Sequence, residues 1–122
     1  MRMWMTQPRT MCDQHLLGEH VELHMFVGTI RQGKSLQGYI DKKLVKVSNI
    51  VRRHTELTHE MRLRGMKHNT PIFVPSYNGP DGELDVEANW QELYRRCEKC
   101  RALIWRMYPQ QVQEWINASN GT

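Results

Sequence analysis

The stretch CDQHLLGEHVELH, which runs from Cys12 to His24, combines three histidines and three acidic residues with apolar residues at helical spacing. At about 100° per residue, the apolar side chains of a helix through this region form one stripe, made of Leu16, Leu23, Val27 and Ile30. His15 and Glu22 are seven residues apart and project together, away from that stripe. Asp13 is a suitable capping residue, so we predict a helix from Asp13 to about Arg31. Such a helix is a candidate wall of an active site.

The length is within the range of one domain, so we expect a single domain that spans residues 1–122. No run of residues approaches the ~18 apolar residues of a membrane-spanning helix, and the polar N-terminus does not resemble a secretory signal. Three cysteines do not form a disulfide framework. We therefore expect a monomeric intracellular protein without a membrane partner.

Positive charge is concentrated in the first part of the chain. Residues 1–70 contain twelve Lys and Arg residues against six Asp and Glu, whereas residues 71–122 contain five against seven. This asymmetry suits a polyanion that contacts the N-terminal part, although an ordinary solvated surface explains it equally well.

The flanking segments predict three main helices, an arm and a loop. Residues 1–11 are expected to be extended and packed into the body, because Pro8 disfavours helix before it and Trp4 needs burial. A second helix is predicted from the lysine-rich region near residues 42–46 to Gly65, and a long ordered loop over residues 66–84, with a brief strand at Ile72–Val74.

The last long helix is predicted over residues 85–107. Its apolar residues recur at alternating spacings of four and three, which is a heptad seam: Val86, Trp90, Leu93, Cys97, Cys100, Ile104 and Met107. Pro109 is expected to end this helix and begin a short one through Trp115.

Two pairs of residues have spacings found in metal sites. Cys97 and Cys100 form a C-x-x-C pair, but their seam positions favour buried, reduced thiols. His20 and His24 could hold a metal from one helix face, but packed histidines are the preferred interpretation. We therefore predict neither a metal nor a cofactor.

The start of the chain is a further candidate for chemistry. An α-amine is partly neutral near pH 7 and can attack an electrophilic carbon. A chain terminus is more often disordered and without function, so the amine becomes a strong candidate only with independent support.

The segment DQHLLGEHVELHMFVG, Asp13 to Gly28, resembles the signature helix of the pyrimidine-dimer DNA glycosylases of the phage endonuclease V type. The opening Met-Arg, the region of Arg31, Gly33 and Lys34, and RRHTELTHEMRLRGM, Arg52 to Met66, are similar to the same family in the same order. The resemblance covers residues 1 to about 68. It implies a compact all-α domain whose N-terminal arm threads between helices.

The resemblance also implies an activity. Such enzymes remove a damaged pyrimidine, a cyclobutane dimer by default, from double-stranded DNA and then cleave the strand as AP lyases through a Schiff base. The resemblance places the nucleophilic α-amine on Met1, the essential glutamate on Glu22 and the helix histidine on His15. It implies the cytoplasm of a bacterial or phage-infected cell.

The expected DNA-binding residues come from the resemblance and from the basic segments after the first helix. They are Arg2, Gln14, Arg31, Lys34, Lys42, Lys43, Lys46, Arg52 and Arg53. Val21 and Met25 stand where the family's phage member has arginines. Two alternatives therefore remain: a non-catalytic DNA-binding module on the same fold, and a small metal-dependent hydrolase that uses His20, His24 and a carboxylate.

Overall fold

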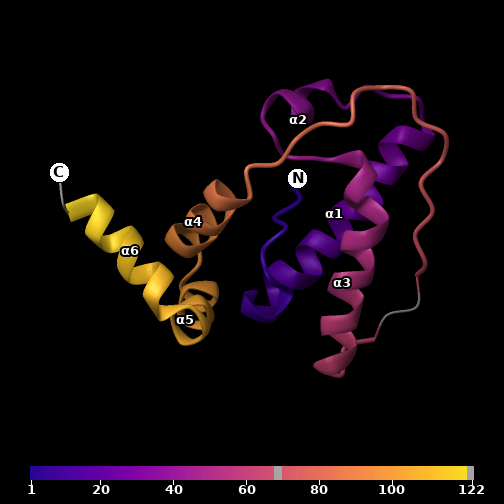
Figure 1. The fold of residues 1–122 in the computed structure, drawn as a ribbon. Coiled ribbons are helices and arrows are strands. Elements are labelled where there is room, and N and C mark those ends of the chain that lie inside the picture. Colours follow the sequence, from indigo (N-terminus) through magenta and orange to yellow (C-terminus); the bar gives the residue numbers. More distant parts are fainter. Residues whose placement is uncertain (68–69, 121–122) are drawn as a thin grey trace.

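A computed structural model describes residues 1–67 and 70–120, and within these the regular elements are all helical. They are, in chain order, η1 (Pro8–Thr10), α1 (Asp13–Arg31), α2 (Gln37–Asp41), η2 (Val47–Asn49), α3 (Ile50–Leu63), α4 (Val86–Arg96), α5 (Glu98–Met107) and α6 (Pro109–Asn120). Figure 1 shows α1 and α3 packed side by side, with α4, α5 and α6 grouped on the other side of the N-terminal arm. The predicted all-α class is confirmed.

Helix α1 begins and ends as predicted. Its apolar stripe is buried against α3, where Ile50, Leu57 and Met61 supply the facing side chains. Cys12 caps its N-terminus, because the Cys12 sulfur accepts a hydrogen bond from the His15 backbone N–H. The cap is therefore one residue earlier than Asp13, which is the first helical residue.

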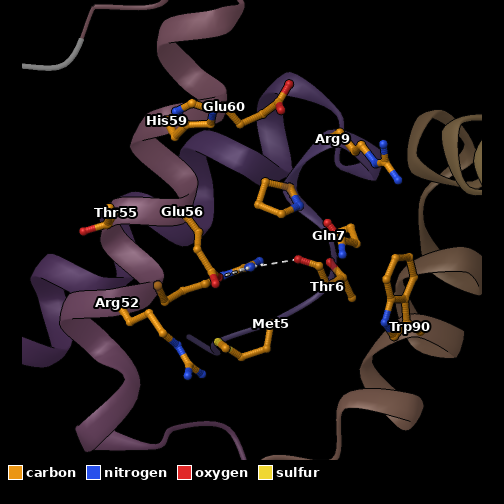
Figure 2. A pocket seen from close by; sticks show the side chains of 12 residues that line it. Met5, Thr6, Gln7, Arg9, Arg52, Thr55, Glu56, His59, Glu60 and Trp90 are labelled. Carbon is orange, nitrogen blue, oxygen red and sulfur yellow. Dashed lines mark hydrogen bonds and ion pairs between the residues drawn. The ribbon is translucent and has the colours of Figure 1, made fainter.

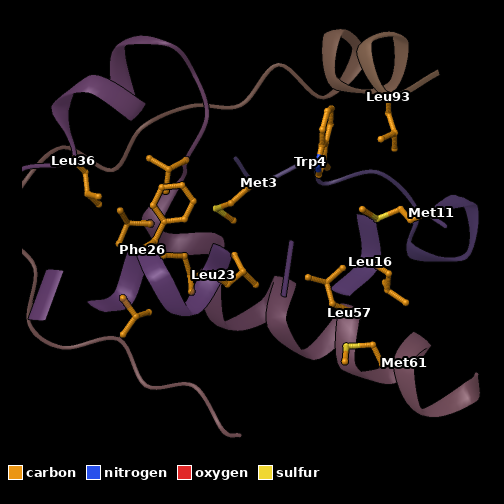
Figure 3. Close-up of a cluster of buried hydrophobic side chains, with 14 of the residues drawn as sticks. Met3, Trp4, Met11, Leu16, Leu23, Phe26, Leu36, Leu57, Met61 and Leu93 are labelled. Carbon is orange, nitrogen blue, oxygen red and sulfur yellow. The ribbon is translucent and has the colours of Figure 1, made fainter. Parts of the chain in front are cut away.

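The N-terminal arm is packed into the body, as expected. Met3 and Trp4 are buried, and Figure 3 shows them between side chains of α1 and Leu93 of α4. The Met3 backbone N–H donates to the Leu44 carbonyl at 2.7 Å. Met5 has a φ of 57°, a left-handed conformation that costs a residue with a side chain about 1–3 kcal/mol. Contacts on both sides must therefore hold the arm in place.

The second helix begins later than predicted. Residues 44–46 are not helical, since the Leu44 carbonyl is occupied by Met3 and Lys46 is extended with a φ of −132°. The 3-10 turn η2 leads into α3 at Ile50. The short helix α2 lies between the two predicted helices, where no helix was predicted.

The long loop is ordered without a strand in its described part, so the brief strand predicted at Ile72–Val74 is absent there. Of the loop predicted over 66–84, His68 and Asn69 lie outside the described residues. The loop passes beside α2 before it reaches α4 (Figure 1). The Asp81 carboxylate fastens it by accepting hydrogen bonds from the Ser48 backbone N–H and hydroxyl, both at 2.7 Å.

The predicted third helix is divided in two, which corrects the single helix inferred from the heptad seam. Cys97 is extended, with φ −119° and ψ 115°, and it ends α4 and caps α5. The seam residues Leu93, Cys100 and Ile104 are nevertheless buried. Val86 is exposed, and Trp90, Cys97 and Met107 are half-buried, so the two helices bury only part of the predicted seam.

Candidate active site

Glu22 faces the start of the chain from α1. Its Oε2 atom accepts a hydrogen bond of 3.1 Å from the backbone N–H of Arg2. Three covalent bonds separate the Met1 amine from that nitrogen, which limits their separation to about 3.7 Å. The amine therefore lies within about 7 Å of the Glu22 carboxylate. The structure brings these two sequence-predicted residues into one site.

Two arginines surround Trp4 at this site. The Arg2 guanidinium lies 4.5 Å from the centre of the Trp4 ring and that of Arg96 lies 5.6 Å from it. Burial, followed by the positive charge of Arg96, lowers the pKa of Arg2, while Glu92 and Glu22 oppose the shift. Arg96 was not among the predicted residues, because it lies beyond the part of the chain that carries the resemblance. The only sequence signal for Arg96 is that it is a basic residue in the last turn of a helix.

His15 lies beside the same tryptophan and against two sulfurs. Its ring centre is 6.0 Å from that of Trp4. Its Nδ1 atom is 3.3 Å from the Cys12 sulfur and 3.7 Å from the Cys100 sulfur. Burial, and then the charge of Arg96, lower the pKa of His15, with Glu22 acting in the opposite direction. These effects favour a neutral imidazole.

Two clusters have the composition of metal sites, and in each the candidate ligand atoms lie within 4.8 Å of one another. One joins Cys12 and His15 to Cys97 and Cys100. The other joins His20 and His24 of α1 to His54 of α3. Both clusters contain residues from segments far apart in the sequence, so local spacing revealed only part of each.

A buried ion pair fixes the arm from the side of α1 and α3. The Arg53 guanidinium donates to both oxygens of Glu19, at 2.6 and 2.8 Å, and to the Thr6 carbonyl at 2.8 Å. Burial raises the pKa of Glu19, and Arg53 and the backbone of Met5 and Trp4 oppose that shift. Arg53 is 1% exposed, so it is not available to DNA and leaves the predicted DNA-binding set. The Arg53 side chain therefore has a structural role.

Asn89 fixes the arm from the side of α4. Its buried side-chain amide donates to the carbonyl groups of Met3 and Trp4, at 3.1 and 3.0 Å. Side chains of α1, α3 and α4 therefore hold the backbone of residues 3–6 in one position. That position sets where Met1 and Arg2 meet Glu22.

The other predicted DNA-binding residues lie on the surface. Gln14, Arg31, Lys34, Lys42, Lys43 and Arg52 are exposed, whereas Lys46 is half-buried. Arg31 ends α1 and Lys42 comes directly after α2, so the structure leaves both free of the core. Val21 and Met25 are also exposed on α1, at 47% and 51%.

A cleft with a volume of about 710 Å³ lies between the arm, α3 and α4. Figure 2 shows Trp90 on one side of residues Met5 to Gln7 and the α3 residues Glu56 and His59 on the other. Arg9 and Arg52 supply positive charge to its lining. Neither Met1 nor Glu22 lines this cleft.

Among the helices of residues 1–67 and 70–120, none is both long and apolar enough to cross a membrane.

Comparison of the sequence with known protein families gives one match. The family model described as pyrimidine dimer DNA glycosylase matches residues 1–74, which include the arm, Glu22, the buried ion pair and the basic segments after α1. No curated protein and no solved structure matches the chain. The match covers more than half of the sequence, and the chain belongs to the pyrimidine dimer DNA glycosylase family.

Proposed function

We propose that this protein is a DNA glycosylase with AP lyase activity that uses the α-amine of Met1 as its nucleophile and Glu22 as its essential carboxylate. The hydrogen bond from the Arg2 backbone to Glu22 is the observation that carries the proposal. It keeps the carboxylate next to the start of the chain, while the buried contacts of the arm prevent that start from drifting. A nucleophile held in this way has little orientational freedom left to lose.

The reaction begins at C1′ of the damaged nucleotide. The neutral amine forms a bond to C1′ as the glycosidic C–N bond breaks, and the base departs with the electron pair of that bond. Glu22 stabilises the positive charge that develops on the sugar. Opening of the C1′–O4′ bond, with a proton transferred from nitrogen to O4′, then gives the Schiff base.

Strand cleavage results from the acidity of the imine. Removal of a proton from C2′ expels the 3′-phosphate and breaks the C3′–O bond, which nicks the strand. Glu22 is the proposed base for this step. His15 is the second proposed proton carrier, through Nε2, because its Nδ1 atom faces the cysteine sulfurs.

The substrate is proposed to be double-stranded DNA bound by a monomer, with a cyclobutane pyrimidine dimer as the default lesion. Arg2 and Arg96, whose guanidinium groups both lie near the Trp4 ring, are proposed to bind the phosphates that flank the sugar. The exposed residues Gln14, Arg31, Lys34, Lys42, Lys43 and Arg52, with half-buried Lys46, are proposed to extend that contact. The damaged base or its partner must leave the stack, which a poorly stacked dimer makes easier.

Borohydride trapping tests the proposal. The protein is incubated with NaBH4 and duplex DNA that carries an abasic site or a cyclobutane dimer, and the covalent adduct is measured by denaturing electrophoresis. Mass spectrometry of the adduct should place the DNA on the Met1 nitrogen. Adding residues before Met1 should abolish trapping, because the amine is then displaced from Glu22.

Glu22→Gln should lower the rate of base removal by at least about a hundredfold without unfolding the protein. Glu114→Gln, on the exposed face of α6, is the matched control and should keep full activity. If the wild-type protein binds DNA but forms no adduct with either substrate, the result would instead favour a non-catalytic DNA-binding module. The apolar side chains of Val21 and Met25 on the surface of α1 also fit that alternative.

A further inference from the structure

Three cysteine sulfurs and one histidine nitrogen converge where the two halves of the chain meet. Cys12 and His15 come from the first turn of α1, and Cys97 and Cys100 come from the break between α4 and α5. Each pair has the form C-x-x-ligand, and the four candidate atoms all lie within 4.8 Å of one another. Cys97 and Cys100 lie outside the segment matched by the glycosylase family, so family membership does not account for this cluster.

The separations fit a tetrahedral ion. Zinc bonds of about 2.3 Å to sulfur and about 2.0–2.1 Å to nitrogen place the ligand atoms of a tetrahedron about 3.8 Å apart for two sulfurs and about 3.6 Å apart for sulfur and nitrogen. The Cys12 and Cys97 sulfurs are 3.9 Å apart. His15 Nδ1 lies 3.3 Å from the Cys12 sulfur and 3.7 Å from the Cys100 sulfur. A disulfide requires sulfurs about 2.05 Å apart, so these atoms are spaced for coordination.

The backbone around the cluster donates hydrogen bonds to the sulfurs. Cys12 and Cys97 cap the N-termini of α1 and α5, where the helix dipoles stabilise negative charge. Their sulfurs accept hydrogen bonds from the backbone N–H groups of His15 and Cys100, at 3.5 and 3.4 Å. The Cys100 sulfur accepts one from the Cys12 backbone at 3.2 Å.

We propose that Cys12, His15, Cys97 and Cys100 bind one Zn²⁺ ion in a closed, structural site. The three thiols lose their protons on coordination, and His15 binds through the lone pair of Nδ1 while Nε2 keeps its proton. The complex carries one negative charge, which the two helix N-termini balance. Four protein ligands leave no open position for water, so the ion is not the catalyst.

The site explains why the predicted long helix breaks at Cys97. A continuous helix would keep Cys97 on the seam beside Cys100, whereas the extended backbone at Cys97 turns its sulfur towards Cys12. The bound ion would join α4 and α5 to the first turn of α1, next to the arm. It would also hold the His15 ring in one orientation with the proton on Nε2, so that His15 could serve the proposed reaction as a proton donor, while proton removal would fall to Glu22.

Cobalt substitution tests the site without any measurement of activity. The full-length protein is purified under reducing conditions, stripped of metal and titrated with Co²⁺. One equivalent should produce thiolate-to-cobalt charge-transfer bands in the near ultraviolet and strong visible bands of tetrahedral cobalt, and Zn²⁺ should then remove both. Native mass spectrometry of protein produced with zinc should show one zinc ion per chain.

Two variants separate this site from the histidine cluster. Cys97→Ser should lower the charge-transfer intensity by about a third or abolish binding, with circular dichroism used to verify the fold. His24→Gln should leave the thiolate bands unchanged. The proposal is overturned if Co²⁺ gives no thiolate bands with the reduced wild-type protein, if Cys97→Ser matches the wild type, or if the purified chain carries a disulfide and no metal.

Discussion

At the scale of the residue, Arg53 shows how burial changes the interpretation of a charged side chain. It was predicted to bind DNA because it adjoins Arg52 in a basic segment. The two side chains differ in burial, since Arg52 is exposed at the cleft while Arg53 is buried against Glu19. Sequence marks both as cations, but only the fold determines which one meets solvent. Glu19, its partner 34 positions away, carried no signal beyond its place in the signature helix.

Glu19→Gln should destabilise the protein by about 3–5 kcal/mol, because it leaves the Arg53 charge buried without its counter-ion. The free energy of unfolding in urea measures the effect. Glu56→Gln is the matched control, since Glu56 also pairs with Arg53, at 3.2 Å, but its side chain is 41% exposed. Its cost should stay below about 1 kcal/mol. Equal urea midpoints for the two variants would contradict the structural role assigned to the buried pair.

The candidate site was only partly predictable at this scale. Met1 and Glu22 came from the resemblance, with the helical spacing of His15 and Glu22 as support. Arg96 and Asn89 could not be found in this way, because their roles depend on the position of α4 against the arm. The sequence also could not show that Cys12 and His15 lie next to Cys97 and Cys100. Long-range contacts of this kind leave no local pattern in a single sequence.

At the scale of the element, the hydrophobic period predicted α1 well and the C-terminal helices less well. Helix α1 has a cap, a continuous apolar stripe and a basic last turn, so its bounds can be derived from local rules. A seam of alternating spacings cannot distinguish one straight helix from two helices that share a buried side. The break at Cys97 depends on one extended residue that the period does not reveal. Helix α2, with five residues and an internal glycine, is too short for a periodic signal.

The loop before α4 depends on Gly82. Its φ is 89°, and a Cβ atom there would lie 2.3 Å from the Val45 carbonyl oxygen, a backbone atom that cannot easily move. Gly82→Ala should therefore lower the free energy of unfolding by at least about 1–3 kcal/mol. Thermal and urea unfolding measure the change.

Gly38→Ala serves as the control for that variant, because Gly38 lies in α2 and a Cβ atom there meets nothing within 4 Å. It should be neutral or slightly stabilising, since alanine favours helix over glycine. A Gly82→Ala protein as stable as Gly38→Ala would show that the loop accommodates a side chain and is not fastened at Gly82.

At the scale of the whole molecule, the hydrophobic core is built from both ends of the chain. Met3 and Trp4 of the arm share it with Leu23 and Leu57, and with Leu93 and Cys100 from the C-terminal helices. The N-terminal segment that carries the family match therefore depends on α4 and α5 for part of its core. Asn89 of α4 adds two hydrogen bonds to the arm, because its side-chain amide donates to the Met3 and Trp4 carbonyl groups.

Asn89→Ala should affect both stability and chemistry. Two buried carbonyl groups in the arm would lose their donor, which costs about 1–3 kcal/mol. The loosened arm should also slow borohydride trapping, by up to about a hundredfold for a displacement near 1 Å. The comparison is Gln91→Ala, an exposed residue of the same helix, which should change neither quantity. Normal trapping by a destabilised Asn89→Ala protein would mean that α4 supports the fold but does not position the amine.

The contact between Arg2 and Glu22 has an evolutionary consequence. Its donor is the peptide N–H, which every amino acid except proline possesses. Anchorage of the carboxylate thus does not depend on the side chain at position 2, as long as Met1 is retained and the residue is not proline. The side chain at position 2 does not hold Glu22, so its identity can vary with the nucleic acid that the protein binds. At position 2 the backbone thus holds the carboxylate, and the side chain is left to contact the nucleic acid.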